Sequence, residues 1–258
     1  MKVVVPVKQV AKLDEDFELR GGDVDPAGLE WELNEWDTFS LEAALQLRDA
    51  AGGGEVVAVS VGDEEAEAGL LRCLAMGADR GIRIWHDGLE GADALAIARV
   101  VAAAVERESP DLVLCGVQSS DAVNSATGIA IAGHLGLAHV AVVKRIELTG
   151  STATCERELE GGLVEVLRIE LPALLTIQTG INEPRYATLR AIKQAREKPL
   201  DVVAPAAIGI EPAQIDAASG GRRRALEPPQ VWRGAEMLDG TTAEVAERIA
   251  AIVRERAA

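Results

Sequence analysis

The stretch that decides the fold is E-V-V-A-V-S-V-G-D-E-E-A-E-A-G-L-L-R-C-L-A-M-G-A-D-R-G-I-R-I-W, residues 55–85. It begins with a Val-rich run, Glu55–Val61, and ends with a second short apolar run, Gly81–Trp85. Such runs are typical of strands that are buried on both faces of a parallel sheet. Between them, residues 64–76 gather their leucines on one helical stripe, and Gly77 stops the helix. The stretch therefore predicts a strand, a helix and a second strand.

The same alternation continues on both sides of this stretch. Further buried strands are expected at Met1–Val7 and Leu112–Gly116, and helices with one apolar stripe at Thr38–Ala51 and Ala94–Glu106. Strands that alternate with helices form a parallel sheet with right-handed crossovers. The sequence therefore predicts an α/β fold with a doubly wound, mostly parallel sheet.

The pattern changes after Gly128, where Ile129–Leu135 completes a helix. Four strand-like runs then follow with little space for helices between them: Val140–Leu148, Thr152–Leu159, Leu163–Leu171 and Ala173–Ile177. Three or four consecutive strands of this kind predict an antiparallel extension of the sheet.

The last part of the chain is expected to leave the globular body. Residues 1–203 are predicted to form the core, and residues 204–258 a Pro-, Gly- and Arg-rich arm that ends in an amphipathic helix at Thr241–Arg256. The apolar stripe of this helix either folds back on its own domain or docks on a second chain.

Composition limits the partners of the chain. A length of 258 residues with 48% hydrophobic content supports one substantial core. A formal net charge of -16 argues against nucleic acid and against an anionic membrane surface. The basic run Arg222–Arg224 is interpreted as a solvated linker or a contact with an acidic protein.

No run reaches the roughly 18 apolar residues that span a bilayer, and the charged N-terminus does not resemble a signal peptide, so a cytosolic location is expected. The cysteines, Cys73, Cys115 and Cys155, lie far apart within apolar runs. They are interpreted as buried small residues, not as a disulfide framework or a zinc site.

A charged loop follows the apolar run Leu171–Ile177 and reads I-N-E-P-R-Y-A-T-L-R-A-I-K-Q-A-R-E-K-P, residues 181–199. Pro184 disfavours a helical residue before it, so the chain leaves its strand extended before a short basic helix near Arg190. The loop holds the only Tyr of the chain and an apolar Leu189. It is available to a partner, although a polar connection with one surface aromatic fits the residues equally.

Three segments follow predicted strands at the edge where open α/β sheets bind ligands: Pro6–Gln9, Val61–Asp63 and Gly116–Thr127. The third is rich in short polar side chains, and the helix after it directs its N-terminal N–H groups to the same place. Gly116 permits close approach of the backbone. The segment suits an anion such as phosphate, and the alternative is that its Ser, Asn and Thr residues only cap the helix.

Six motifs are spread from Val7 to Leu189, and the most specific is N-E-P-R-Y-A-T-L at Asn182–Leu189. The others are V-K-Q-V at Val7–Val10, L-N-E-W-D at Leu33–Asp37, C-L-A-M-G-A-D-R at Cys73–Arg80, D-L-V-L-C-G-V-Q-S-S-D at Asp111–Asp121 and R-E-L-E-G-G at Arg157–Gly162. Together these motifs resemble the beta (small) subunit of electron-transfer flavoproteins. The L-N-E-W-D-T-F-S and G-V-Q-S-S-D variants are most similar to the branch that accepts electrons from trimethylamine dehydrogenase.

The resemblance implies a fold like that of the adenine nucleotide alpha hydrolases, with AMP bound at the sheet edge and FAD held mainly by an alpha subunit. The AMP-binding residues that it implies are Pro6, Asn34, Glu35, Trp36, Asp37, Val61, Gly116, Gln118, Ser119, Ser120, Asp121, Asn124, Ser125, Ala126 and Thr127. Ala126 departs from the Gln of some relatives. Leu13 is implied to approach the flavin, and Glu158 to lie near the flavin domain of the partner.

The resemblance also implies protein partners. The C-terminal arm would contact the alpha subunit, and the loop would bind the electron-donating dehydrogenase, possible donors being trimethylamine dehydrogenase and the acyl-CoA dehydrogenases. The loop residues implied in that contact are Glu183, Pro184, Arg185, Tyr186 and Leu189, with Leu189 as the anchor. Such a carrier delivers its electrons to an acceptor oxidoreductase and catalyses no reaction on a substrate.

No motif for another chemistry competes with this interpretation. The chain lacks the G-x-x-x-x-G-K-[ST], G-x-G-x-x-G, G-x-S-x-G and H-E-x-x-H motifs. Its histidines, His86, His134 and His139, are well separated. Two alternatives stay open: a free-standing nucleotide-binding or AMP-sensing protein of the same architecture, and a bifurcating relative that carries its own FAD in place of AMP.

Overall fold

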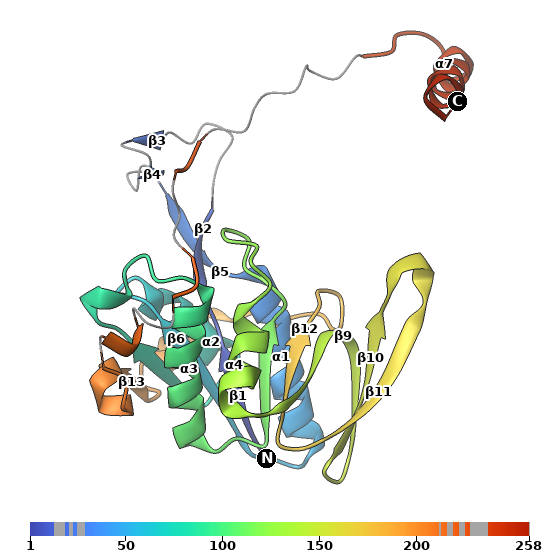
Figure 1. The fold of residues 1–258 in the computed structure, drawn as a ribbon. Helices are drawn as coiled ribbons and strands as arrows, with labels where there is room; N and C mark the ends of the chain where they lie inside the picture. Colours follow the sequence, from blue (N-terminus) through green and yellow to red (C-terminus); the bar gives the residue numbers. More distant parts are fainter. Residues whose placement is uncertain are drawn as a thin grey trace. The chain divides into compact units, whose positions relative to one another are not determined.

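The computed structural model describes residues 1–12, 19–20, 23–24, 29–211, 213–215, 219–221, 225–227 and 237–257. Contacts divide the chain into two compact units, residues 1–17 with 25–224, and residues 18–24 with 225–258. The larger unit contains a nine-stranded sheet in the order β11-β10-β9-β12-β8-β1-β6-β7-β13 (Figure 1). The predicted α/β class, with its mostly parallel sheet and antiparallel extension, is confirmed.

The parallel part of the sheet holds five strands that the sequence predicted, with small shifts at their ends, and a sixth that it did not. Its members are β1 (Lys2–Pro6), β6 (Glu55–Val61), β7 (Arg80–Ile84), β8 (Leu112–Gly116), β12 (Ala173–Ile177) and β13 (Leu200–Val203). The extension consists of β9 (Ala138–Thr149), which is parallel to β12, followed by the antiparallel β10 (Thr152–Glu158) and β11 (Val164–Glu170).

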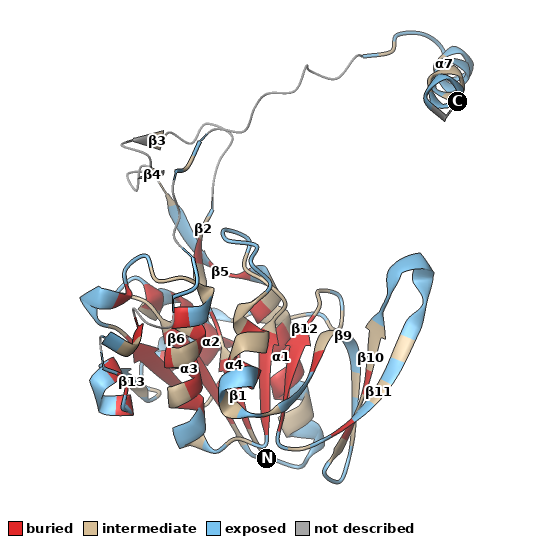
Figure 2. Cartoon of the chain, viewed as in Figure 1, coloured by how far each residue is buried: buried red, intermediate tan, exposed pale blue. Residues whose placement is uncertain are grey.

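Helices cover both faces of the sheet. One face packs against α1 (Glu35–Ala50), α2 (Ala66–Met76) and α5 (Leu189–Ala195), and the other against α3 (Ala94–Glu108) and α4 (Thr127–Leu135). The alternation of side chains along β1 shows the two cores directly, because Val3 and Val5 enter the first and Val4 the second. The central strands are almost entirely buried, whereas the far end of the β10–β11 hairpin is exposed (Figure 2).

Two features of the sheet differ from the sequence prediction. Ala173–Ile177 is not part of the antiparallel extension but lies between β8 and β9, parallel to both. All five of its residues are buried, which is the pattern of a strand covered on both faces, so the hydrophobic effect places it in the centre. The prediction also missed β13 at one edge and a small antiparallel pair, β2 (Gln9–Lys12) with β5 (Glu30–Leu33).

The chain follows the main body beyond residue 203, where the arm was predicted to begin. After the 3-10 helix Pro205–Ile208, the side chains of Ile208, Ile210 and Ile215 are buried in the core beneath α3. The smaller unit contains β3 (Leu19–Arg20), β4 (Asp23–Val24) and the C-terminal helix α7 (Thr242–Ala257). Leu13 and Arg222–Arg224 lie outside the described residues.

Candidate functional site

A cavity of about 270 Å³ lies at the carboxyl ends of β1, β6 and β8, where open α/β sheets bind ligands. Its lining comes from five places in the sequence: the loops after these three strands, the start of α1 and the start of α3. The cavity brings together Pro6, Asn34, Asp37, Val61, Gly116, Gln118, Ser119, Asn124, Ser125, Ala126 and Thr127, all named from the sequence. The fold thus gathers residues that are as far as 121 positions apart, from Pro6 to Thr127.

Some of the residues named from the sequence do not line this cavity. Glu35, Trp36, Ser120 and Asp121 lie beside lining residues in the chain but are not part of the wall. Glu158 lies at the end of β10, where its carboxylate accepts a hydrogen bond from Lys144 Nζ at 2.6 Å.

The sequence analysis missed one wall of the cavity. It consists of Ala92, Asp93 and Ala94 at the start of α3, with Ile97 and Val101 one and two turns further along that helix. The signal was present, because this helix follows a predicted strand as the other helices do, and its N-terminus therefore meets the same sheet edge. Lys8, in the predicted wall Pro6–Gln9 after β1, is also a lining residue.

Asn34 holds the loop of residues 116–127 in place. The side chain is 1% exposed, its Nδ2 donates to Gln118 O at 2.9 Å, and its Oδ1 accepts from Ser120 N at 3.2 Å. The Asn34 N–H donates to Lys8 O at 2.9 Å. A buried amide with both ends paired is rigid, so Asn34 fixes the shape of this loop relative to the loop after β1.

Asp37 lies behind this loop, 5% exposed, and its Oδ2 accepts from Lys8 N at 2.7 Å. Burial raises the pKa of Asp37 to about 7, against hydrogen bonds from Lys8, Asn34 and Gly116 that lower it. Gly116 is required here, because a β-carbon on it would lie 2.5 Å from Asp37 Oδ1 and 2.7 Å from Trp36 Cβ. The loop therefore approaches α1 as closely as a backbone can.

The two helices that begin at the cavity differ in how their N-termini are satisfied. At α3, Asp93 Oδ1 accepts from Leu95 N at 3.1 Å and Ala96 N at 3.0 Å, and its Oδ2 accepts from Gly220 N at 2.6 Å and Gly221 N at 2.7 Å. These bonds keep the pKa of Asp93 below its usual value.

At α4 the N-cap residue is Ala126, which makes no side-chain cap hydrogen bond. Among the described residues, no side chain accepts from the first-turn N–H groups of α4, and Ser125 Oγ donates instead to Gln118 Oε1 at 2.9 Å. The polar residues before α4 therefore do not cap it. An uncapped helix start at a cavity is a site for an anion, since its N–H groups and dipole both favour negative charge.

Lys8 and Asp121 form an ion pair between the loops after β1 and β8. The Lys8 Nζ lies 2.8 Å from Asp121 Oδ1 and 2.6 Å from its Oδ2. Burial acts to raise the pKa of Asp121, but the bonds from Lys8 and Ser119 outweigh it and hold the pKa below its usual value. Since Lys8 lines the cavity, this pair joins the loop after β1 to the loop that precedes α4.

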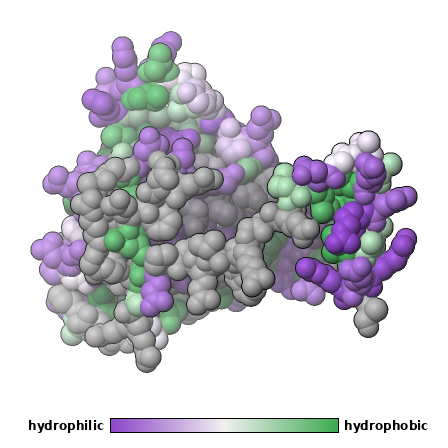
Figure 3. Space-filling view, turned by 90° about the horizontal axis from the view of Figure 1, so that it is seen from above, coloured by the Kyte–Doolittle hydropathy of each residue, from purple (hydrophilic) through white to green (hydrophobic). Residues whose placement is uncertain are grey.

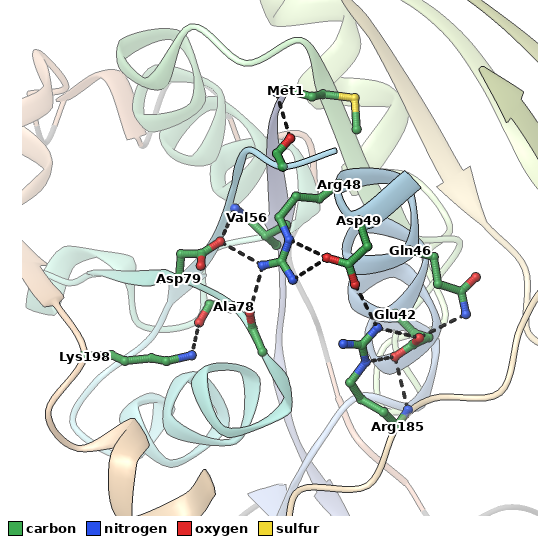
Figure 4. Close-up of polar contacts among 12 residues, drawn as sticks. Met1, Glu42, Gln46, Arg48, Asp49, Val56, Ala78, Asp79, Arg185 and Lys198 are labelled. Carbon is green, nitrogen blue, oxygen red and sulfur yellow. Dashed lines mark hydrogen bonds and ion pairs between the residues drawn. The ribbon is translucent and has the colours of Figure 1, made fainter. Parts of the chain in front are cut away.

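The loop of residues 181–199 is fixed to the body at both ends (Figure 4). Arg185 makes a bidentate pair with Glu42 of α1, with Nε to Oε2 at 2.7 Å and Nη2 to Oε1 at 3.0 Å. Burial acts to raise the pKa of Glu42, but the bonds from Arg185 and Gln46 outweigh it and lower the pKa. At the other end, Lys198 Nζ donates to Leu74 O at 2.8 Å and Ala78 O at 2.6 Å, at the end of α2.

The middle of this loop is exposed. Tyr186 is 91% and Leu189 81% exposed, the two most exposed large hydrophobic side chains of their segment, whereas Ala195 in the same segment is buried. Of the residues named from the sequence as partner contacts, Arg185 is therefore held by its own chain, and Tyr186 and Leu189 stand free. A firm base with an exposed apolar tip is the arrangement that a docking loop requires.

Residues 22–208 match the family model of the electron transfer flavoprotein domain. Over 261 aligned residues, the chain is 45% identical to the electron transfer flavoprotein subunit beta of Methylophilus methylotrophus, covering 99% of this chain and 98% of the relative. The chain belongs to the electron transfer flavoprotein beta subunits. Identity is 31% over 258 residues to the Bacillus subtilis subunit beta, covering 100% and 99% of the two chains. It is 37% over 186 residues to the human subunit beta, covering 71% and 72%.

Membership of the beta subunits makes this chain part of an electron carrier, not a catalytic enzyme, as the motifs predicted. Within the described ranges, no helix has the length and apolar character needed to cross a membrane. The same ranges contain no cluster of three or more His, Cys, Asp or Glu side chains that could hold a metal ion.

Proposed function

We propose that this beta subunit binds AMP in the cavity at the sheet edge, pairs with an alpha subunit that holds FAD, and presents the loop 181–199 to an electron-donating dehydrogenase. The observation that carries the AMP assignment is the uncapped N-terminus of α4 at the cavity. Its N–H groups bind the phosphate, and Lys8, paired with Asp121, lies in the same wall. The cavity thus binds an anion in a chain of net charge -16, because local donors outweigh distant screened charges.

The size of the cavity favours AMP over FAD. Small-molecule sites usually measure about 300–1,000 Å³, and the cavity, at about 270 Å³, lies just below this range. A mononucleotide suits such a volume, whereas a dinucleotide such as FAD has more than twice the atoms. This argues against the alternative in which the beta subunit carries its own FAD. FAD supplies the redox chemistry when it is bound by the alpha subunit, and the residues of this chain position that subunit and its donor.

Two exposed apolar surfaces support pairing with an alpha subunit. On α7, Ile249 is 50% and Val253 60% exposed, and Figure 3 shows hydrophobic residues on this helix beside hydrophilic ones. On β11, the outermost strand of the sheet, Val164 is 59% and Val166 61% exposed. Uncovered edges and apolar helix stripes are features that a partner covers. A free-standing sensor would not need either of them.

The proposed contact with the electron-donating dehydrogenase depends on the loop of residues 181–199. Leu189 is the anchor of the contact, since one exposed apolar side chain on a polar loop can fill a small pocket in a partner. The sequence variants L-N-E-W-D-T-F-S and G-V-Q-S-S-D favour trimethylamine dehydrogenase as the donor, with acyl-CoA dehydrogenases as the second candidate class. A carrier of this kind releases its donor quickly and passes the electron to an acceptor oxidoreductase.

The first test identifies the bound nucleotides. The purified complex is denatured, and the released adenine compounds are measured by mass spectrometry. We expect one AMP and one FAD per heterodimer, with the FAD lost when the alpha subunit is removed. Two FAD molecules would show a beta subunit with its own flavin, and a colourless homodimer that binds ATP would show a sensor.

The second test addresses the open helix start. Ala126→Asp supplies a capping carboxylate, so α4 should become more stable by about 1 kcal/mol while the negative charge expels the phosphate. Ala126→Asn, the matched control, caps without a charge and should retain more AMP. AMP content that is unchanged in Ala126→Asp would remove the helix start from the binding site.

A further inference from the structure

A second cavity, of about 560 Å³, lies between α2 and the loop of residues 181–199. We call it the arginine groove. Its lining is Thr38, Ala68, Leu71, Arg72, Ala75, Met76, Pro184, Arg185, Tyr186, Ala187, Ile192 and Arg196. It is separate from the AMP cavity, with which it shares no lining residue.

The groove has an apolar floor. Ala75 and Met76 are buried in the core, Leu71 is half-buried above them, and Ile192 of α5 is 44% exposed at the side. Such a floor gains free energy when an apolar side chain displaces water from it. The space between the walls of the groove is open and is not filled by any described side chain.

The rim of the groove is positive. Three arginines and no carboxylate belong to its lining. Arg185 is paired with Glu42, but Arg72 and Arg196 are exposed and have no carboxylate of the described residues within ion-pair distance. The segment 181–199 carries five Lys or Arg and two Glu, a net charge of +3, in a chain of net charge -16. Positive charge collected in one place on an acidic protein selects an acidic partner surface.

The groove and the anchor Leu189 belong to one surface. Residues Pro184–Ala187 form a wall of the groove, and Leu189 follows two residues later, at the start of α5. A protein that covers Leu189 therefore also covers the groove. The loop therefore presents one projecting side chain, Leu189, beside one recess, the arginine groove. Interfaces commonly combine a side chain that enters the partner with a pocket that receives a side chain from it.

We infer that the arginine groove receives an apolar side chain, flanked by carboxylates, from the electron-donating protein. This inference rests on the proposed function and adds the chemistry of the donor surface. The apolar side chain lies on the floor formed by Leu71, Ala75 and Met76, and the carboxylates meet Arg72 and Arg196. Contact in both directions fixes the donor in one orientation, whereas Leu189 alone leaves it free to rotate.

The test fills the groove or reverses its charge. Ala68 is exposed on α2, so Ala68→Trp occupies the groove without entering the core, and the double variant Arg72→Glu with Arg196→Glu reverses the rim. The matched controls are Ala50→Trp and Arg107→Glu, at exposed helix positions outside both cavities. The readout is the second-order rate constant for reduction of the heterodimer by trimethylamine dehydrogenase reduced with trimethylamine, and by an acyl-CoA dehydrogenase.

We expect both groove changes to slow reduction about tenfold, with the charge reversal also weakening its salt dependence, while both controls react like the unmodified heterodimer. FAD content and thermal stability should stay unchanged, which excludes misfolding. If Leu189→Ala slows transfer but neither groove change does, the groove inference is overturned and the proposed function stands. If Ala68→Trp slows reduction but the charge reversal does not, the proposed contact of donor carboxylates with Arg72 and Arg196 is wrong. If neither dehydrogenase reduces the unmodified heterodimer, the proposed donor fails and the inference with it.

Discussion

Residues 116–127 and residues 181–199 are both segments that follow buried strands, and each is held by a few polar contacts. In the first, Asn34 pairs with the loop backbone and leaves the main-chain N–H groups of α4 open. In the second, Arg185 pairs with Glu42 and leaves side chains, Tyr186 and Leu189, exposed. In the proposed function, a small anion is therefore recognised by backbone and a protein by side chains, and in both cases polar pairs hold the recognising groups in place.

The largest effect is expected at Gly116, where the backbone of the cavity loop approaches α1 most closely. In Gly116→Ala, the new β-carbon would lie 2.5 Å from Asp37 Oδ1 and 2.7 Å from Trp36 Cβ. Overpacking of this kind costs about 1–3 kcal/mol, so the urea midpoint and the AMP content should fall together. The control is Gly133→Ala in α4, where a β-carbon meets nothing within 4 Å and the helix gains about 0.5–1 kcal/mol. Equal stability of the two variants would contradict a tight cavity wall.

An effect of similar size, on the rate of electron transfer, is expected at the tip of the loop of residues 181–199. Leu189→Ala should slow reduction by the dehydrogenase by a factor that corresponds to about 1–3 kcal/mol, because the anchor is lost. The free energy of unfolding and the FAD content should not change, since Leu189 is 81% exposed. Val202→Ala, at a 59% exposed position on β13, is the control and should transfer electrons normally. Normal transfer by both variants would remove the loop from the docking surface.

Loss of the Arg185–Glu42 pair at the base of the loop should slow electron transfer less than Leu189→Ala does. It should lower the free energy of unfolding more. Glu42→Gln removes the charged partner of Arg185, and hydrogen bonds to charged groups contribute about 1.5–3 kcal/mol. Hydrogen exchange should increase in residues 181–188. Glu147→Gln breaks an exposed pair with Arg145 and should change the free energy of unfolding by less than about 1 kcal/mol. A loop that exchanges no faster in Glu42→Gln would show that the pair does not hold it.

A further prediction is a pH dependence of stability that comes from Asp37. Its folded pKa is about 7, above the unfolded value near 3.8, so folding takes up a proton between these values. This contribution to stability is complete below about pH 4 and is lost as the pH rises through 7. Asp37→Asn should be less stable overall but should lack this slope in urea unfolding between pH 5 and pH 8. A slope that is identical in both proteins would assign it to other groups.

The sequence predicted most of the sheet because buried parallel strands and striped helices have distinct patterns. The sequence also predicted the two ends of the cavity loop, residues 116–127, since a predicted strand ends at Gly116 and a predicted helix begins near Thr127. The pairing of Arg185 with Glu42 was not visible, because the two residues are 143 positions apart and each looks like a surface charge. The wall at Asp93 was missed although its position after a predicted strand could be read from the sequence, because the alanines beside Asp93 carry no polar group that marks a binding site.

The exposed edge of β11 has a consequence for how this beta subunit is made. A ribosome that releases the chain alone releases a seven-residue strand with one free side and two uncovered valines, Val164 and Val166. Such a strand pairs readily with another copy of itself and leads to aggregation. Translation of both subunits close together in time would cover this strand soon after it folds, so co-expression should raise the yield of dispersed protein.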